Sequence, residues 1–223
     1  MSIVTELRAV NKRYRRGDEV VHALRDVSFT LSSGEMVALV GPSGCGKSTT
    51  LNLVAGVDRP DEGEVIVCGT DLATAGEAAL VAARRHDIGI VFQAFHLMPH
   101  LTVEENVALP LALDGHRDAA RVAELIRRVG LASRRAHFPA ELSGGEQQRT
   151  AVARALVHRP AVVLADEPTG SLDSASGAAV LRLMDELRRE EGSALLLVTH
   201  DENIATVADR VIRLRDGGIE AVL

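Results

Sequence analysis

Aromatic residues and cysteines are scarce in this sequence. Tryptophan is absent, and aromatic residues make up 2% of the 223 residues. Surfaces that bind single-stranded nucleic acids stack bases on aromatic side chains, so this composition argues against such a surface. The two cysteines, Cys45 and Cys68, are too few for a disulfide framework in a chain of this length. We expect two unpaired thiols in a reducing compartment.

Long apolar segments and a net positive charge are also lacking. The N-terminal residues 1–16 contain no continuous apolar core of the kind that marks a signal peptide. No stretch approaches the roughly 20 apolar residues needed to span a bilayer. The formal net charge of −6 argues against a broad nucleic-acid-binding surface. We therefore expect a cytoplasmic protein that binds no nucleic acid, does not insert into a membrane, and reaches one only through a partner.

Short apolar runs alternate with helical patterns along the chain. The runs occupy residues 36–40, 88–92, 162–165, 194–198 and 211–214. Bounded by polar residues or glycine, they are typical of strands buried on both faces of a parallel sheet. Between them, apolar residues recur with helical spacing around residues 122–129 and 180–187. This alternation predicts an α/β fold.

The first third of the chain has a different pattern. Val27, Phe29 and Leu31 alternate with polar residues, as do Val65 and Val67. Alternation with a period of two is typical of antiparallel strands with one buried face. We expect a small antiparallel sheet packed on the main one.

Residues 41–48, with the sequence GPSGCGKS, match the phosphate-binding pattern GxxxxGK[ST]. An apolar strand precedes the motif, and a helix can begin at Lys47. Glycines let successive N–H groups point at phosphate oxygens, and a helix N-terminus adds positive potential. Lys47 would place a charge near the β- and γ-phosphates, and Ser48 would supply a hydroxyl ligand for Mg²⁺. A glycine-rich turn without nucleotide is the alternative, and the strand and helix around the motif argue against it.

An apolar run ending in two acids, VVLADE at residues 162–167, is a Walker B pattern. Asp166 is the candidate Mg²⁺ ligand, and Glu167 is the candidate general base that accepts a proton from the attacking water. Many strands end in solvated acids that have no such role. The phosphate loop in the same chain favours the functional interpretation.

The segment LSGGEQQR at residues 142–149 opens another helix. Ser143 and Glu146 have the spacing of a capping box, which explains both of them structurally. It does not explain Gly144 and Gly145, because each glycine costs about 1 kcal/mol relative to alanine in a helix. We expect a helix N-terminus with a free hydroxyl and bare amides that binds an anion.

This segment resembles the signature motif of ABC-type ATPases, and the other motifs of that family follow in order from Tyr14 to His200. The resemblance implies a P-loop NTPase core with a mostly parallel sheet, an N-terminal antiparallel β subdomain and an inserted helical subdomain. It implies a single domain over residues 1–223, with the core at 1–93 and 158–223 and the helical subdomain at 94–157. It also implies that two copies pack head to tail, each ATP lying between one phosphate loop and the other copy's signature helix.

Residue by residue, the resemblance implies that Tyr14 stacks on adenine and that Gln93 contacts Mg²⁺ and the attacking water. It implies that Asp173 belongs to a loop that crosses the dimer interface and that His200 contacts the γ-phosphate. The expected catalytic residues are Glu167, His200, Gln93 and Lys47. The expected ATP-binding residues are Tyr14, Gly41, Ser43, Gly44, Cys45, Gly46, Lys47, Ser48, Thr49, Ser143, Gly144, Gly145, Glu146 and Asp173. The expected Mg²⁺ ligands are Ser48, Gln93 and Asp166.

Residues 95–110 resemble the helical subdomain of lipoprotein-releasing, macrolide-exporting and cell-division transporters. In that group a membrane subunit inserts a coupling helix beside this subdomain, so the expected partners are a second copy and an integral membrane permease at the inner face of the cell membrane. DNA-repair and translation-factor ATPases of the same family carry a coiled-coil insertion or two cassettes, and neither is seen here. A regulatory ATPase that works a membrane partner without moving a solute remains the alternative.

Overall fold

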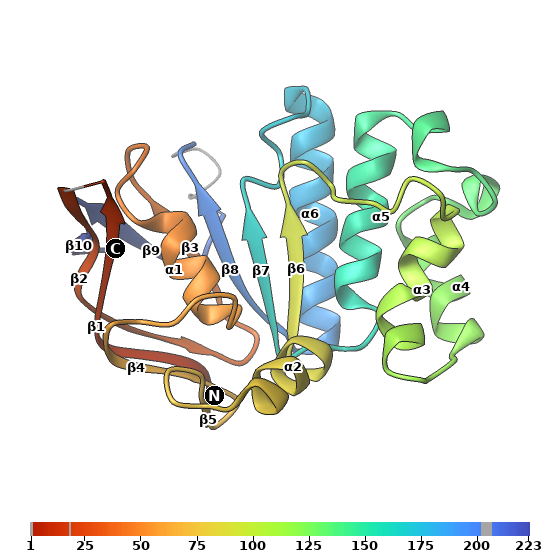
Figure 1. The fold of residues 1–223 in the computed structure, drawn as a ribbon. Coiled ribbons are helices and arrows are strands. Elements are labelled where there is room, and N and C mark those ends of the chain that lie inside the picture. The colour runs from red at the N-terminus through yellow and green to blue at the C-terminus, as the bar shows by residue number, and fades with distance from the viewer. Residues whose placement is uncertain (1, 18, 202–206) are drawn as a thin grey trace.

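The computed structural model describes residues 2–17, 19–201 and 207–223, which form two sheets flanked by helices (Figure 1). A four-stranded sheet has the order β2-β1-β4-β5, and a six-stranded sheet has the order β10-β9-β3-β8-β7-β6. The first contains β1 (Ile3–Arg16), β2 (Glu19–Ser32), β4 (Glu62–Val67) and β5 (Thr70–Asp71). The second contains β3 (Met36–Val40), β6 (Ile88–Phe92), β7 (Val162–Asp166), β8 (Ala194–Thr199), β9 (Arg210–Arg215) and β10 (Gly218–Val222).

The six-stranded sheet is parallel except for β10, which pairs antiparallel with β9. All five apolar runs of the sequence are strands of this sheet, as predicted. Strand β7 extends one residue beyond its run, to Asp166, and β8 likewise extends to Thr199. The carboxyl ends of parallel strands meet at one edge of a sheet, so both polar ends lie on the same edge.

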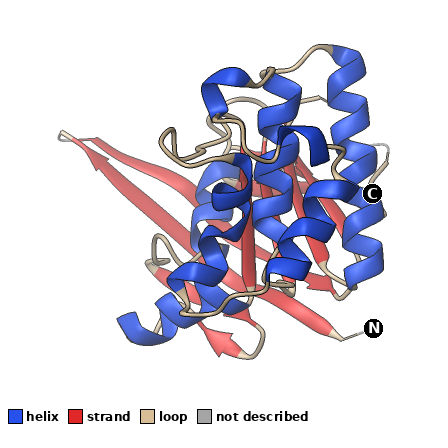
Figure 2. Cartoon of the chain, turned by 90° about the vertical axis from the view of Figure 1, so that its right-hand side faces the viewer, coloured by secondary structure: helices blue, strands red, loops and turns tan. Residues whose placement is uncertain are grey.

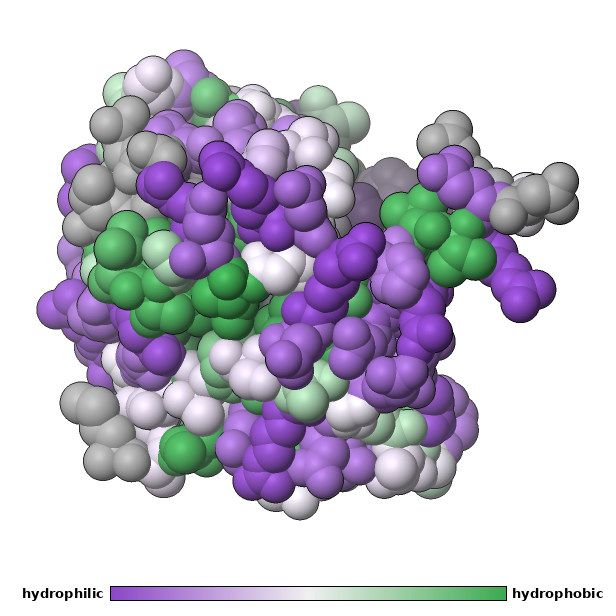
Figure 3. Space-filling model, turned by 90° about the vertical axis from the view of Figure 1, so that its left-hand side faces the viewer, coloured by the Kyte–Doolittle hydropathy of each residue, from purple (hydrophilic) through white to green (hydrophobic). Residues whose placement is uncertain are grey.

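The four-stranded sheet is antiparallel, which confirms the prediction from the alternating pattern. Val27, Leu31, Val65 and Val67 are fully buried on its inner face. The far ends of β1 and β2 project from the body of the molecule as a hairpin (Figures 2 and 3). Apolar surface is visible on this projection in Figure 3, where Val20 and Val21 are exposed.

The central sheet is covered on both faces. On one face lie α1 (Lys47–Val54), α2 (Glu77–His86) and the antiparallel sheet. On the other lie α5 (Gly144–Leu156) and α6 (Ser174–Glu191), with α3 (Val103–Leu113) and α4 (Ala119–Arg128) packed outside them (Figures 1 and 2). The short 3₁₀ helices η1 (Ala132–Arg134) and η2 (Pro139–Glu141) lead into α5. Residues of β8 alternate between the faces: Leu196 packs in the first core and Leu197 in the second.

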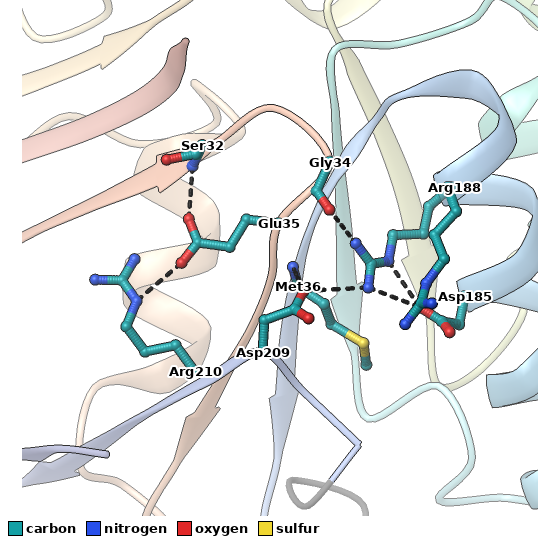
Figure 4. Close-up of polar contacts among 9 residues, drawn as sticks. Ser32, Gly34, Glu35, Met36, Asp185, Arg188, Asp209 and Arg210 are labelled. Atoms are coloured by element: carbon teal, nitrogen blue, oxygen red, sulfur yellow. Dashed lines mark hydrogen bonds and ion pairs between the residues drawn. The ribbon is translucent and has the colours of Figure 1, made fainter. Parts of the chain in front are cut away.

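A buried arginine joins three elements near the amino end of β3 (Figure 4). The Arg188 residue is 2% exposed, and its guanidinium donates to the carbonyl oxygen of Gly34 and to Asp185 and Asp209. Asp209 in turn accepts from the Met36 N–H at 2.7 Å. A charge this deep is stable only when fully paired, so the network fixes α6 and the start of β9 against β3. This edge of the sheet is opposite the one that carries the motifs.

Both cysteines are unpaired, as expected: Cys45 is buried and Cys68 is exposed. Among the described residues, the helices are all too short or too polar to cross a membrane.

Candidate active site

The phosphate-binding motif forms the turn between β3 and α1. Gly41 and Gly46 have φ angles of +153° and +107°, and a Cβ on either would lie within 2.4 Å of a backbone oxygen. No other residue fits these two positions, because the strands behind the loop leave no room. The sequence therefore builds a tight turn whose backbone is open on its outer side, and α1 begins at Lys47 as predicted.

The Lys47 ammonium bridges this turn. Its Nζ donates to the carbonyl oxygens of Gly41 at 2.8 Å and Pro42 at 3.0 Å, and the residue is only 8% exposed. These two acceptors are neutral, so the ammonium charge has no anionic partner among its hydrogen bonds. A phosphate is a stronger acceptor for it than a carbonyl.

A pocket of about 250 Å³ lies over the turn. Most of the predicted phosphate-binding residues line it, together with both Walker B acids. They are Ser43, Gly44, Gly46, Lys47, Ser48, Thr49, Asp166 and Glu167, joined by Val21, Ala23 and Val198. Gly41 and the buried Cys45 lie behind this surface and shape the turn from within.

The two acids at the end of β7 are half-buried side by side. Burial raises the pKa of Asp166, and the neighbouring Glu167 carboxylate raises it further, whereas a hydrogen bond with Ser48 and the Lys47 charge act in the opposite direction. A carboxylate and a hydroxyl in contact, next to a second carboxylate, are an oxygen donor set of the kind that divalent cations prefer.

Glu167 has a strained backbone, with a φ angle of +46°. Its N–H donates to the Val198 carbonyl at 2.9 Å, which holds it in this conformation. Its side chain is hydrogen-bonded to Nδ1 of His200 at 2.7 Å, and the Thr199 hydroxyl donates to it at 3.4 Å. Strain of this kind persists only where the surroundings enforce it, and it orients the carboxylate over the pocket.

The signature segment forms the N-terminus of α5. Ser143 and Glu146 form the complete capping box, and the Ser143 hydroxyl donates to Glu146 at 2.9 Å. The expectation of a free hydroxyl is therefore wrong for the single chain, because the Glu146 carboxylate occupies it. The amides of Gly144 and Gly145 belong to the first turn, where no intrahelical acceptor exists.

Among the described residues, none excludes a side chain at these two positions. A Cβ on Gly144 would meet no heavy atom closer than 3.4 Å, and one on Gly145 none closer than 3.6 Å. Both distances are ordinary van der Waals contacts. The described part of the chain therefore has room for a side chain at both positions.

Gln93, Asp173 and the signature segment are not part of the pocket lining. The Ser171 hydroxyl donates to the Gln93 carbonyl at 3.2 Å, and Asp173 caps α6 by accepting from the N–H groups of Ala175 and Ser176. These residues gather around the start of α5, whereas the phosphate turn leads into α1. In Figure 1, α1 and α5 lie on opposite sides of β7 and β8.

Tyr14 lies at the pocket rim, in register with Val21 of β2, which lines the pocket. The residue is 39% exposed. Its hydroxyl donates to Oδ2 of Asp58 at 2.7 Å and is hydrogen-bonded to Thr49.

Gln148 and Arg154 of α5 connect the motifs, although the sequence patterns did not predict a role for either residue. The Gln148 amide donates to the carbonyls of Phe92 and Pro168, which flank the segments of Gln93 and Glu167. The Arg154 guanidinium donates to the carbonyls of Phe95 at 2.8 Å and His96 at 2.6 Å. A signal for Gln148 was present, because it lies on the apolar face of the helix with Ala151, Val152 and Ala155.

The α/β core carries a phosphate turn, a Walker B acid pair and a helix that begins with two glycines. Together these features define a P-loop ATPase domain of the ABC class. A family model described as "ABC transporter" matches residues 24–170. The chain belongs to this family, and its domain is the ATP-binding, ATP-hydrolysing one.

Known proteins of the family are similar over nearly the whole chain. The macrolide export ATP-binding/permease protein MacB of Shigella flexneri is 45% identical over 222 residues, which are 98% of this chain and 34% of that protein. The chain thus spans about a third of the macrolide export relatives. The lipoprotein-releasing system ATP-binding protein LolD of a Shewanella species is 43% identical, covering 99% of this chain and 96% of that protein.

A solved structure matches the whole fold. The dimeric post-hydrolysis state of the ATP-binding cassette MJ0796, bound to ADP and phosphate, superposes with a TM-score of 0.90 at 40% identity. The match covers 98% of this chain and 97% of that one.

Proposed function

We propose that this chain is the motor subunit of an ABC transporter and that it hydrolyses ATP only as a closed pair of copies. One observation carries this proposal. The pocket contains the phosphate loop and both acids, while the signature glycines lie elsewhere, and no described neighbour excludes a side chain at either of them. Two copies arranged head to tail would place the signature amides of one over the pocket of the other. The dimeric form of the MJ0796 cassette supports the pairing of two copies.

In the proposed site the phosphates of ATP replace the carbonyls that Lys47 now contacts, and the backbone of the phosphate turn surrounds them. Ser48 and Asp166 are the proposed protein ligands of Mg²⁺, with Gln93 joining them when its loop moves toward the pocket. The hydrogen bond between Ser48 and Asp166 and the raised pKa of Asp166 fit a cation-binding role. When bound, Mg²⁺ neutralises charge on the β- and γ-phosphates.

Glu167 is the proposed general base for the attacking water. Its carboxylate reaches the pocket, and His200 holds one carboxylate oxygen at 2.7 Å. His200 is exposed and is proposed to exchange this contact for one to the γ-phosphate when ATP enters. The proton taken from water passes to Glu167, while Lys47 and His200 stabilise charge on the transferred phosphoryl group.

The proposed contact with a membrane permease lies beside the helical subdomain. A groove of about 440 Å³ is lined by apolar side chains of β6, of α3 and of the loop between them, among them Phe92, Met98 and Leu113, and by cations including Arg84 and Arg154. Such a lining suits a short amphipathic helix with an acidic edge. Through such a permease the chain would work at the cytoplasmic face of the membrane, and the two relatives named above favour an export or lipoprotein-releasing type.

The test is the Glu167→Gln variant, which keeps the shape of the site but removes the base. We expect turnover to fall by about a hundredfold or more. We also expect ATP to hold the variant as a dimer in gel filtration, because the γ-phosphate that bridges the copies is no longer cleaved. Glu186→Gln, a change on the exposed face of α6, is the matched control and should behave as the unmodified chain. A Glu167→Gln variant that stays monomeric with ATP and turns over normally would refute the assignment.

Transport is tested separately from hydrolysis. Co-purification with a membrane protein, followed by reconstitution in vesicles, should show ATP-dependent movement of a solute or release of a lipoprotein. ATP-dependent conformational change of the partner without such movement would favour the mechanotransmitting alternative.

A further inference from the structure

Tyr14 is held by a charged cluster that belongs to a distant part of the chain. Its hydroxyl donates to Oδ2 of Asp58 at 2.7 Å. The Lys12 ammonium donates to Oδ1 of Asp58 at 2.7 Å and to the Arg59 carbonyl at 2.7 Å. The same ammonium lies 5.1 Å from the centre of the Tyr14 ring, within the range of a cation–π interaction.

The geometry of β1 accounts for this grouping. Lys12 and Tyr14 are two residues apart on a strand, so their side chains leave the strand on the same side. Lys12 is only 8% exposed, and a lysine this deep needs an anionic partner. Asp58 meets that need with one carboxylate oxygen and receives the Tyr14 hydroxyl with the other. The carboxylate therefore holds the ammonium and the ring together.

The protonation states of Tyr14 and Asp58 suit their roles as donor and acceptor in this hydrogen bond. Burial raises the pKa of Tyr14 to about 12, and the Asp58 hydrogen bond contributes, so the hydroxyl remains a donor. Burial acts to raise the pKa of Asp58, but hydrogen bonds from Lys12 and Tyr14 outweigh it and the pKa is lowered. Asp58 thus remains an anionic acceptor at neutral pH.

Asp58 is in turn fastened to the helix that begins at the phosphate turn. Its N–H and that of Val57 donate to the Asn52 carbonyl in α1. The following residues are tied to β1, because Asp61 accepts from the Arg13 N–H at 2.6 Å and donates its own N–H to the Asn11 carbonyl. A continuous chain of contacts therefore runs from Lys47 along α1 to Asp58 and the Tyr14 ring.

We propose that Asp58, supported by Lys12, is a positioning residue that sets the Tyr14 ring at a fixed place relative to the phosphate loop, so that the ring can stack on the base of ATP. This inference rests on the proposed function and on the expectation, from the resemblance to ABC-type ATPases, that Tyr14 stacks on adenine. It adds that base affinity depends on a carboxylate that touches neither the base nor the phosphates. Removing that carboxylate should weaken binding of the base while leaving binding of the phosphates intact.

The experiment measures dissociation constants for ATP and for inorganic tripolyphosphate, which has phosphates but no base. Tyr14→Phe keeps the ring and the ion pair between Lys12 and Asp58 but loses the hydroxyl. We expect Tyr14→Phe and Asp58→Ala each to weaken ATP binding by about three- to tenfold, a fraction of what base stacking contributes. Tripolyphosphate binding should not change. Tyr14→Phe also loses the hydrogen bond to Thr49, and Asp58→Ala also loses the contact with Lys12. The double variant should weaken ATP binding by less than the two single effects combined, because both changes break the hydrogen bond between Tyr14 and Asp58.

Glu64→Gln is the matched control, since Glu64 pairs with Arg8 of the same strand far from the ring. It should leave both affinities unchanged. Tyr14→Ala removes the ring itself and should weaken ATP binding by about tenfold or more. If Tyr14→Ala has this effect while Tyr14→Phe and Asp58→Ala have none, the positioning role is refuted and the adenine contact stands. An equal loss for ATP and tripolyphosphate in Asp58→Ala also refutes it. If Tyr14→Ala changes nothing, the adenine assignment itself fails.

Discussion

At the scale of single residues, the motifs contain glycines of two different kinds. Gly46 is required by the fold: its φ angle is +107°, and a Cβ would lie 2.4 Å from the carbonyl oxygen of Ala23. Gly145 has a helical backbone, and a Cβ there would make only ordinary van der Waals contacts, the nearest at 3.6 Å. The fold itself explains the first glycine, whereas no described neighbour of the second excludes a side chain.

This difference predicts opposite effects of the same substitution. Gly46→Ala should lower the free energy of unfolding by at least about 2 kcal/mol, because it adds backbone strain and a steric overlap. Gly145→Ala should leave stability unchanged or raise it by up to about 1 kcal/mol, the ordinary gain in helix propensity. In a Glu167→Gln background, Gly145→Ala should weaken ATP-dependent dimer formation by about tenfold, the value of one charge-assisted hydrogen bond. Urea unfolding and gel filtration measure the two quantities.

Gly144→Ala is the companion variant, because a Cβ at Gly144 would also make only ordinary van der Waals contacts. A large loss of stability in Gly145→Ala would show that the chain itself needs this glycine. Normal dimer formation in both variants would show that neither glycine faces a ligand across the interface.

Local sequence was sufficient to find some of these residues and insufficient for others. The phosphate turn and the acids after β7 are encoded in short consecutive segments, and the structure brings them together in one pocket. Asp58 gave no signal, because its partners Lys12 and Tyr14 are far away in the sequence and the pairing depends on how α1 ends. The spacing of Ser143 and Glu146 predicts the capping box, but whether the Ser143 hydroxyl also donates to Glu146 depends on side-chain rotamers that the spacing does not determine.

At the scale of elements, α5 connects the signature segment to the loop after β6. Phe95 and His96 in that loop have φ angles of +59° and +48°, which non-glycine residues rarely adopt. The Arg154 guanidinium donates to the carbonyls of both. Arg154 thus links α5 directly to the loop that carries Gln93.

Arg154→Met keeps the apolar stem but removes both hydrogen bonds. We expect kcat for ATP hydrolysis to fall by about tenfold with little change in KM, because the loop that carries Gln93 loses its support while the phosphate pocket is intact. The free energy of unfolding should fall by about 2 kcal/mol. Steady-state ATPase assays and thermal unfolding measure these quantities.

Arg59→Met is a matched control, because Arg59 also donates to two backbone carbonyls, those of Ala73 and Ala75, outside the motifs. Its variant should lose stability without losing kcat. Equal kinetic effects in the two variants would assign Arg154 a purely structural role.

The elements themselves were largely predictable. Strands buried on both faces leave uninterrupted apolar runs, so β3 and β6 have the predicted bounds. The capped helices α5 and α6 were marked by Ser143 and by the apolar spacing after Asp173. The order of strands in the sheet was not predictable, since it depends on pairings between distant segments. The charged network of Arg188 likewise depends on the end of α6 meeting the start of β9.

At the scale of the whole molecule, the proposed mechanism makes each catalytic site a property of two chains. The phosphate turn and the signature helix lie on opposite sides of the central sheet, so one chain does not fold its signature over its own pocket (Figure 1). In a head-to-tail pair each chain would give its turn to one site and its signature to the other. A closed pair of this kind has two equivalent sites related by a twofold axis.

This arrangement predicts that two inactive variants restore activity when mixed. Lys47→Ala damages the phosphate turn and leaves the signature intact, whereas Gly145→Asp places a carboxylate where the signature would meet phosphate and leaves the turn intact. Each variant alone should lack turnover, because every site in its dimer is damaged.

In a mixed dimer one site combines both damaged parts and the other combines both intact parts. Random pairing makes about half of the dimers mixed, each with one working site of two, so an equal mixture should recover about a quarter of normal turnover. If each chain instead completed its own site, mixing would restore nothing, and activity would stay at the level of the separate variants at every ratio tested.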